Sequence, residues 1–306
     1  MKNSLGLYQK SLSEDQSAVL VTVEAKELLS EISNRVSAFP PAMKHLGDAV
    51  LGAALMHALG DSDDEEKLEL QWKCAGEFGQ LYADVLGPGR MRATIQNPQP
   101  DVFDFDHGLG EGLMQARRVK GDYPASTGII ESSGDVGKDV ISYLQTSEQK
   151  DCYLSTHVEI IWDKEAEARG DARPFKVIRA DGFLIHILPQ NDAKKKEDNL
   201  SLWLQRMNVG GPLSQWAMPE NSKEALDFML HILTVGSKPQ SFGYQAINFD
   251  CTCSKERAKR ALTLLSQSEL DEMSVDEDGQ DQSLLEITCE YCSSTYSIDL
   301  TQLKSE

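Results

Sequence analysis

The stretch NFDCTCSKERAKRAL, residues 248–262, places two cysteines one residue apart in a chain of 306 residues that has only six cysteines. These are Cys251 and Cys253, and a second close pair, Cys289 and Cys292, follows in ITCEYC. Four thiolates in two close pairs are a common ligand set of a closed tetrahedral zinc site. The spacing therefore predicts one Zn²⁺ per chain, held by these four cysteines.

The C-x-C pair has a geometric property that an ordinary zinc ribbon does not need. In an extended backbone its Cα atoms lie about 6.6 Å apart, close to the upper limit of about 6.8 Å for a disulfide. A disulfide between Cys251 and Cys253 would need a bent backbone, and strained disulfides tend to be reversible. Oxidation of both pairs would destroy the zinc site and unfold a small domain. On spacing alone, a structural zinc ribbon and a redox switch fit equally well.

The charge of the chain excludes several classes of partner. The net charge is −19, and residues 251–306 hold five basic and twelve acidic side chains, many of them in SELDEMSVDEDGQDQS. Nucleic acids and anionic membranes are bound through Lys and Arg, so we expect neither as a partner. The N-terminus lacks an apolar signal segment, and the longest apolar stretch, residues 49–60, is too short to span a bilayer. We therefore expect a cytoplasmic protein whose clustered cysteines bind metal or act in redox chemistry.

The pattern of apolar residues divides the chain into three parts. Residues 1–190 read as an α+β domain with a mostly antiparallel sheet, including an Ala/Leu-rich helix that ends at Gly60 and several alternating strands such as KLELQWKCAG. Residues 191–245 begin with the charged stretch NDAKKKEDN and continue as short amphipathic helices, so they read as a helical linker. Residues 246–306 carry the two cysteine pairs and form the predicted C-terminal zinc domain.

The chain resembles the redox-regulated holdase chaperones of the bacterial 33-kilodalton heat-shock protein family. The most specific matches are FDCTCSKERAKRALTLL, SELDEM and LEITCEYCSSTYSID. Further matches follow in the expected order in the core, among them FPPAMKHLGDAVLGAALM, LELQWKCAGEFGQLYADV, RATIQNP, GLGEGLMQARR, DVISYLQTSEQ and DGFLIHILP. The resemblance covers nearly the whole chain.

This resemblance implies an α+β domain, a metastable helical linker and a C-terminal zinc domain. It also implies an ATP-independent holdase that is inactive when reduced and zinc-bound. Oxidation would form disulfides within each cysteine pair, release the zinc, unfold the linker and expose an apolar surface to unfolding client proteins. Family members are commonly dimeric when active, so the resemblance implies an active homodimer. The acidic stretch between the pairs is somewhat long for the family.

The linker sequence suits an element that unfolds. Gly210, Gly211, Pro212 and Pro219 keep its helices short and marginal. Its Met and Trp side chains adapt to irregular partners, although in the reduced state we expect them to pack on the core. The candidate client-binding residues are Leu202, Trp203, Met207, Trp216, Met218, Phe228 and Met229.

Two other functions use the same cysteines. A zinc-ribbon adaptor would bind one protein partner regardless of redox state. A thiol oxidoreductase would turn over through Cys289 and Cys292, but the strand-to-helix setting of thioredoxin-type motifs is absent from the sequence. The remaining cysteines, Cys74 and Cys152, lie in strand-like segments and read as buried, inert thiols. The sequence therefore favours a non-enzymatic protein.

Overall fold

The polypeptide folds into two compact units, Met1–Asp250 and Cys251–Glu306. The structure is a computed structural model of the whole chain. It describes residues 4–60, 66–101, 108–121, 123–189, 193–235, 237–273 and 284–300. The predicted acidic stretch between the cysteine pairs lies largely outside the described residues.

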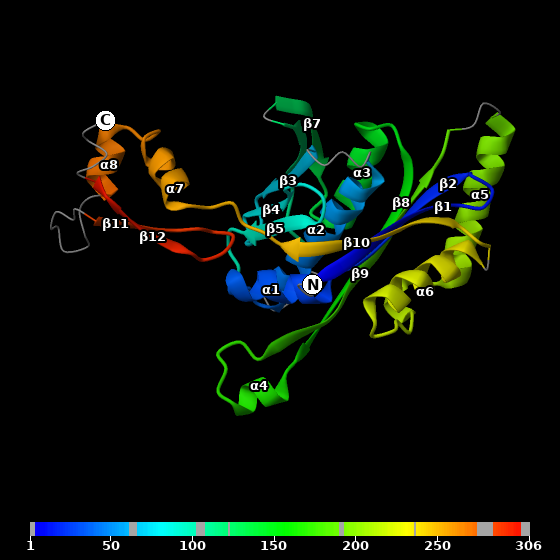
Figure 1. The fold of residues 1–306 in the computed structure, drawn as a ribbon, viewed down its shortest axis with the longest axis horizontal. Helices are drawn as coiled ribbons and strands as arrows, with labels where there is room; N and C mark the ends of the chain where they lie inside the picture. The colour runs from blue at the N-terminus through cyan, green and yellow to red at the C-terminus, as the bar shows by residue number, and fades with distance from the viewer. Residues whose placement is uncertain are drawn as a thin grey trace. The chain divides into compact units, whose positions relative to one another are not determined.

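A ten-stranded sheet forms the frame of the first unit, in the order β7-β6-β3-β4-β5-β10-β1-β2-β9-β8 (Figure 1). Neighbouring strands are antiparallel except β5 and β10, which are parallel and pair only at Arg90–Asn248 and Met91–Phe249. This architecture confirms the predicted α+β class. The strands are β1 (Gly6–Leu12), β2 (Ala18–Glu24), β3 (Glu66–Cys74), β4 (Gln80–Val85), β5 (Arg90–Ile95), β6 (Gly112–Lys120), β7 (Tyr123–Ser132), β8 (Asp151–Trp162), β9 (Phe175–Ile187) and β10 (Gln240–Phe249).

Helix α2 is the central helix of this unit because its sequence is apolar on nearly every side. It has prolines at its first positions, which suit the start of a helix, and Gly60 is its C-cap as predicted. The Lys10 ammonium donates to the carbonyls of Leu59 (3.2 Å) and Gly60 (2.8 Å), so a cation satisfies the helix C-terminus. No helix in the described ranges is long and apolar enough to cross a membrane. The helices of this unit are α1 (Lys26–Arg35), α2 (Pro40–Leu59), α3 (Val136–Thr146), α4 (Lys164–Ala168), α5 (Ala193–Gly210), the 3-10 turn η1 (Leu213–Gln215) and α6 (Ser222–Thr234).

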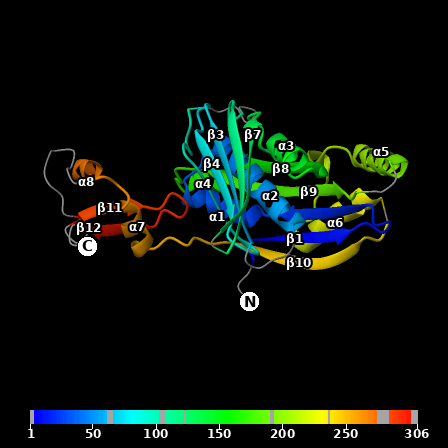
Figure 2. The ribbon, with the colours of Figure 1, turned by 90° about the horizontal axis from the view of Figure 1, so that it is seen from above.

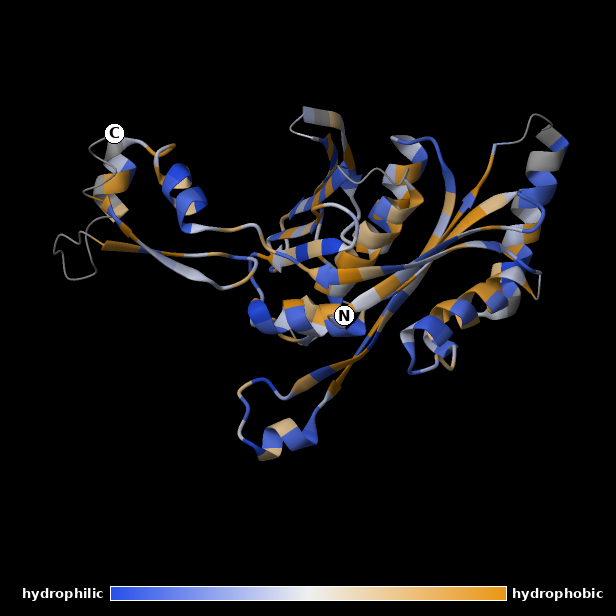
Figure 3. Ribbon diagram, viewed as in Figure 1, coloured by the Kyte–Doolittle hydropathy of each residue, from blue (hydrophilic) through white to orange (hydrophobic). Residues whose placement is uncertain are grey.

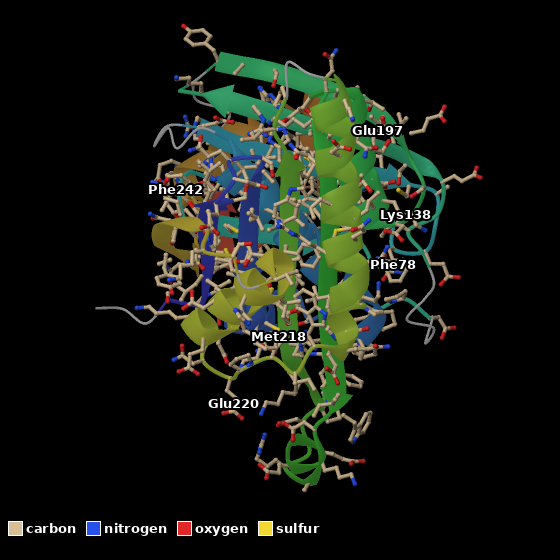
Figure 4. All side chains as sticks on the ribbon, turned by 90° about the vertical axis from the view of Figure 1, so that its right-hand side faces the viewer. Phe78, Lys138, Glu197, Met218, Glu220 and Phe242 are labelled. Atoms are coloured by element: carbon tan, nitrogen blue, oxygen red, sulfur yellow. The ribbon has the colours of Figure 1, made fainter. Side chains whose placement is uncertain are left out.

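Strands β2 and β9, of which β9 lies next to the edge strand β8, are buried on both faces over much of their length. On β2, Val21 and Val23 belong to the core around α1 and α2, whereas Leu20 belongs to a separate core on the opposite face. On β9, Leu184 and Phe183 divide in the same way, because successive side chains of a strand point to opposite faces. We call the separate core the second core. It is closed by α5, η1 and α6, which Figures 2 and 4 show from two directions.

The predicted linker, residues 191–245, contains α5, η1, α6 and the first part of strand β10. Helix α5 begins at Ala193, inside the charged stretch that opens the linker. Residues 246–249 complete strand β10, so they belong to the large sheet and not to the C-terminal unit, which begins at Cys251. The separate unfolding of residues 191–245 stays a prediction.

The second unit contains little regular structure and a small core. A two-stranded antiparallel hairpin, β11 (Leu284–Thr288) and β12 (Thr295–Asp299), accompanies α7 (Lys255–Leu262) and α8 (Gln267–Met273). Only Leu262, Ile298 and Leu300 form its fully buried apolar cluster within the described residues. Such a core is too small to stabilise a domain of this size alone, so a further source of stability is expected.

Candidate metal centre

Cys251 and Cys253 lie in the irregular segment just before α7. The helix begins with Ser254 as its N-cap, whose hydroxyl accepts from the Arg257 backbone N–H at 3.2 Å. The Arg257 guanidinium in turn donates to the Thr252 carbonyl at 3.0 Å, which fixes the backbone between the two cysteines. The helix start therefore sets the position of the C-x-C pair.

Cys289 and Cys292 lie in the tight turn that joins β11 to β12. The Cys289 N–H donates to the Ser294 carbonyl at 2.9 Å, and the Ser293 N–H donates to the Cys289 carbonyl at 2.8 Å. Ser293 takes a left-handed backbone conformation with φ of 57°, which lets the chain reverse there. The backbone N–H groups of Tyr291 and Cys292 bond to the Cys289 sulfur, so this turn presents donors to a thiolate.

The four cysteine sulfurs converge on one point, within 4.8 Å of one another. Cys251 Sγ lies 3.8 Å from Cys289 Sγ, and Cys253 Sγ lies 3.3 Å from Cys292 Sγ. Sulfurs around a tetrahedral Zn²⁺ at about 2.3 Å would be about 3.7 Å apart. The donor set and spacing thus fit a metal ion of this kind. The structure brings together all four predicted ligands, and their metal role stays a prediction.

The thiols of this cluster differ in acidity. Burial raises the pKa of Cys253 to about 12, although the Tyr296 hydroxyl, 3.1 Å away, favours its thiolate. Burial also acts against ionisation of Cys292, but hydrogen bonds with the Ser294 hydroxyl and backbone and with neighbouring cysteines lower its pKa to about 6. Cys292 is thus a thiolate at neutral pH and a ready metal ligand.

Cys74 and Cys152 lie in the first unit, on β3 and β8. Cys152 is 2% exposed, and burial raises its pKa to about 12. Cys74 is half-buried, lies 3.5 Å from the Ser132 hydroxyl, and has a pKa that burial raises. A protonated, enclosed thiol reacts slowly with oxidants, which agrees with the interpretation of both as inert.

Six of the seven candidate client-binding residues belong to the second core or pack against it. Figure 3 shows the mixed hydropathy of α5 and α6. Trp203 and Met229 are fully buried, and the Trp203 indole N–H donates to the Ser17 hydroxyl at 3.1 Å. Trp216 is 6% exposed and stacks on Phe183 of β9, with ring centroids 5.7 Å apart. Met207, Met218 and Phe228 are half-buried at the margin of this core, whereas Leu202 of α5 is exposed and is not among the residues that pack against it. Figure 4 labels Met218 beside the loop that leads into α6.

One polar contact between the sheet and this helical layer escaped the sequence analysis. Arg179 on β9 donates to both carboxylate oxygens of buried Asp181, each at 2.9 Å. The same guanidinium donates to the carbonyls of Leu213 (3.3 Å) and Trp216 (3.2 Å). We call this arrangement the Arg179 clamp. No local signal in the sequence indicates it, because the two carbonyl acceptors lie more than thirty residues from Arg179 in the chain.

The chain is similar to known proteins over nearly its whole length. The family profile described as "Hsp33 protein" matches residues 7–299. The "33 kDa chaperonin" of Bacillus subtilis (strain 168) is 26% identical over 308 residues, covering 96% of each chain. The protein of the same name from Picosynechococcus sp. is 30% identical over 277 residues, covering 85% of each. The crystal structure of the 33 kDa chaperonin (heat shock protein 33 homolog) from Thermotoga maritima matches the fold with a TM-score of 0.78, at 22% identity, over 98% of this chain and 97% of that one.

Proposed function

The chain belongs to the Hsp33 protein family, and from this membership we propose that it is a redox-regulated, ATP-independent holdase chaperone. The family supports a chaperone role. The regulation is proposed from one observation above all: four free thiols lie within 4.8 Å of one another in a unit whose own apolar core is very small.

In the reduced state, Cys251, Cys253, Cys289 and Cys292 would hold one Zn²⁺. The bound ion would cross-link the α7 segment to the β11–β12 turn and supply folding free energy that the small core lacks. The layer of α5, η1 and α6 would meanwhile cover the apolar side chains of the second core. The protein would then present no surface to clients.

Oxidation would remove the ligands in pairs. Each disulfide takes two electrons from two thiolates, and one peroxide molecule accepts them and becomes two hydroxide ions. We propose the pairs Cys251–Cys253 and Cys289–Cys292. With its thiolates consumed, the site would release its metal and the second unit would unfold. Strand β10 ends two residues before Cys251, so this unfolding would remove a support from the segment that follows α6.

The uncovered surface would then bind partially unfolded proteins. The candidate client-binding surface would include apolar side chains from two layers. The helical layer contributes the candidate residues named above, and strand β9 of the sheet contributes Phe183 and Ile185. We propose that the active form is a homodimer and that the protein works in the reducing cytoplasm, where the switch would be kept off. Its acidity argues against nucleic acid and anionic membranes as partners.

A light-scattering assay tests this function. The reduced, zinc-loaded protein is expected to leave the aggregation of a heat-unfolded client unchanged. After treatment with hydrogen peroxide and mild heat, or with hypochlorous acid, the same protein should suppress aggregation stoichiometrically without ATP. Equal suppression by both forms would instead favour a zinc-ribbon adaptor without redox switching.

A further inference from the structure

The four cysteines of the metal centre receive different hydrogen bonds. Backbone N–H groups bond to Cys289, and the backbone and hydroxyl of Ser294 bond to Cys292. Cys253 is contacted by the phenol of Tyr296 at 3.1 Å. Within the described residues, no hydroxyl bonds to Cys251, whose sulfur contacts that of Cys289. The two members of the C-x-C pair are therefore chemically unequal.

The hairpin register places the phenol where it can reach the C-x-C pair. Tyr296 on β12 pairs with Ile287 of β11, close to the turn that carries the second cysteine pair. Alternation along β12 sends the flanking side chains of Thr295 and Ser297 to the opposite face. Tyr296 can thus bond to a sulfur that comes from a different segment of the unit.

A hydrogen bond donated to a thiolate draws electron density away from the sulfur. Groups that donate hydrogen bonds to a metal-binding side chain hold that side chain in place and change its reactivity. A thiolate that carries this bond is a poorer nucleophile toward peroxide than one that lacks it. Because Cys251 and Cys253 are consumed together in one disulfide, the bond decides which of them reacts first.

The geometry points to Tyr296 as a positioning residue that protects Cys253 and makes Cys251 the first sulfur of the C-x-C pair to be oxidised. This inference rests on the proposed function. Cys251 attacks one peroxide oxygen, the O–O bond breaks, hydroxide leaves and a sulfenic acid forms. Cys253 then attacks that sulfur, the S–O bond breaks, the disulfide forms and a second hydroxide leaves. Two thiolates and one peroxide thus give one disulfide and two hydroxide ions, which the buffer protonates.

The test compares Tyr296→Phe with Ser297→Ala, which removes an exposed hydroxyl from the same strand and serves as the matched control. Zinc release from the loaded protein is followed with a chromogenic chelator after addition of hydrogen peroxide. Loss of one ordinary hydrogen bond should speed attack on Cys253 about 2- to 12-fold. Because Cys251 already reacts in wild type, we expect Tyr296→Phe to release zinc up to about 2-fold faster than wild type. Ser297→Ala should match wild type.

A second readout locates the first oxidised sulfur of the C-x-C pair in wild type and in Tyr296→Phe. Dimedone traps sulfenic acid at early times, and peptide mass spectrometry then locates the adduct. We expect it on Cys251 in wild type, and on both cysteines in Tyr296→Phe. A wild-type adduct on Cys253, or equal release rates in the two variants, would overturn the inference. Neither readout uses a client, so a failure to suppress aggregation would count against the proposed function alone.

Discussion

Replacing Cys251 and Cys253 together with serine is expected to abolish tight zinc binding and unfold the second unit. Serine hydroxyls are poor ligands for Zn²⁺, and two thiolates alone do not close a tetrahedral site. Structural Zn²⁺ contributes about 10–16 kcal/mol to small zinc domains, far more than the cluster of Leu262, Ile298 and Leu300 can replace. Zinc content should fall from one per chain to none, as measured by elemental analysis of the purified protein.

Limited proteolysis of the same variant shows where the damage lies. We expect rapid cleavage within Cys251–Glu306 and, because the helical layer opens, within α5 and α6, whereas β2, β9 and α2 of the separately compact first unit stay uncleaved. Cys74→Ser is the matched control, since it removes a cysteine that lies outside the cluster and should keep its zinc. Unchanged zinc content in Cys251→Ser/Cys253→Ser would disprove the site.

Loss of the Arg179 clamp is expected to activate the chaperone without oxidation. Arg179→Met with Asp181→Asn removes both hydrogen bonds to the carbonyls of η1 and its C-cap, and it leaves no unpaired charge buried in β9. Each charge-assisted bond contributes about 1.5 kcal/mol, so opening of the helical layer should become favourable by on the order of 100-fold. The reduced variant should suppress client aggregation while it still holds one zinc.

A second arginine–aspartate pair two residues apart provides the control. Arg169→Met with Asp171→Asn removes an exposed pair beyond α4, where the side chains are 61% and 49% exposed. This control should stay inactive until oxidised. If the clamp variant behaves like it, the contacts between Arg179 and η1 do not hold the layer closed.

The sequence predicted those features that depend on local pattern or on metal chemistry. Helix α2 with its cap at Gly60 follows from composition, and the convergence of the four cysteines follows from the coordination that zinc requires. Leu68, Leu70 and Trp72 share the buried face of β3, as the alternation predicts.

The structural features that the sequence pattern does not reveal depend on contacts between segments that are distant in the chain. Strand β10 reads as part of the linker because Gln240–Ala246 are exposed and its partner β1 lies more than 200 residues earlier. The two cores on either side of β2 and β9 are not evident from the mostly apolar stretches at residues 18–23 and 183–187, because such stretches do not reveal what covers each face. The contact of Tyr296 with Cys253 depends on how the hairpin packs against a loop outside it.

Hydrogen–deuterium exchange of one sample, before and after peroxide, tests the central claim most directly. That claim is that loss of metal from the cysteine cluster opens the helical layer of the first unit. In the reduced protein, the amides of α5 and α6 should be protected. After oxidation has released the zinc, they should exchange rapidly while β2 and β9 stay protected. Continued protection of α5 and α6 in a sample that has released its zinc and suppresses client aggregation would contradict the account.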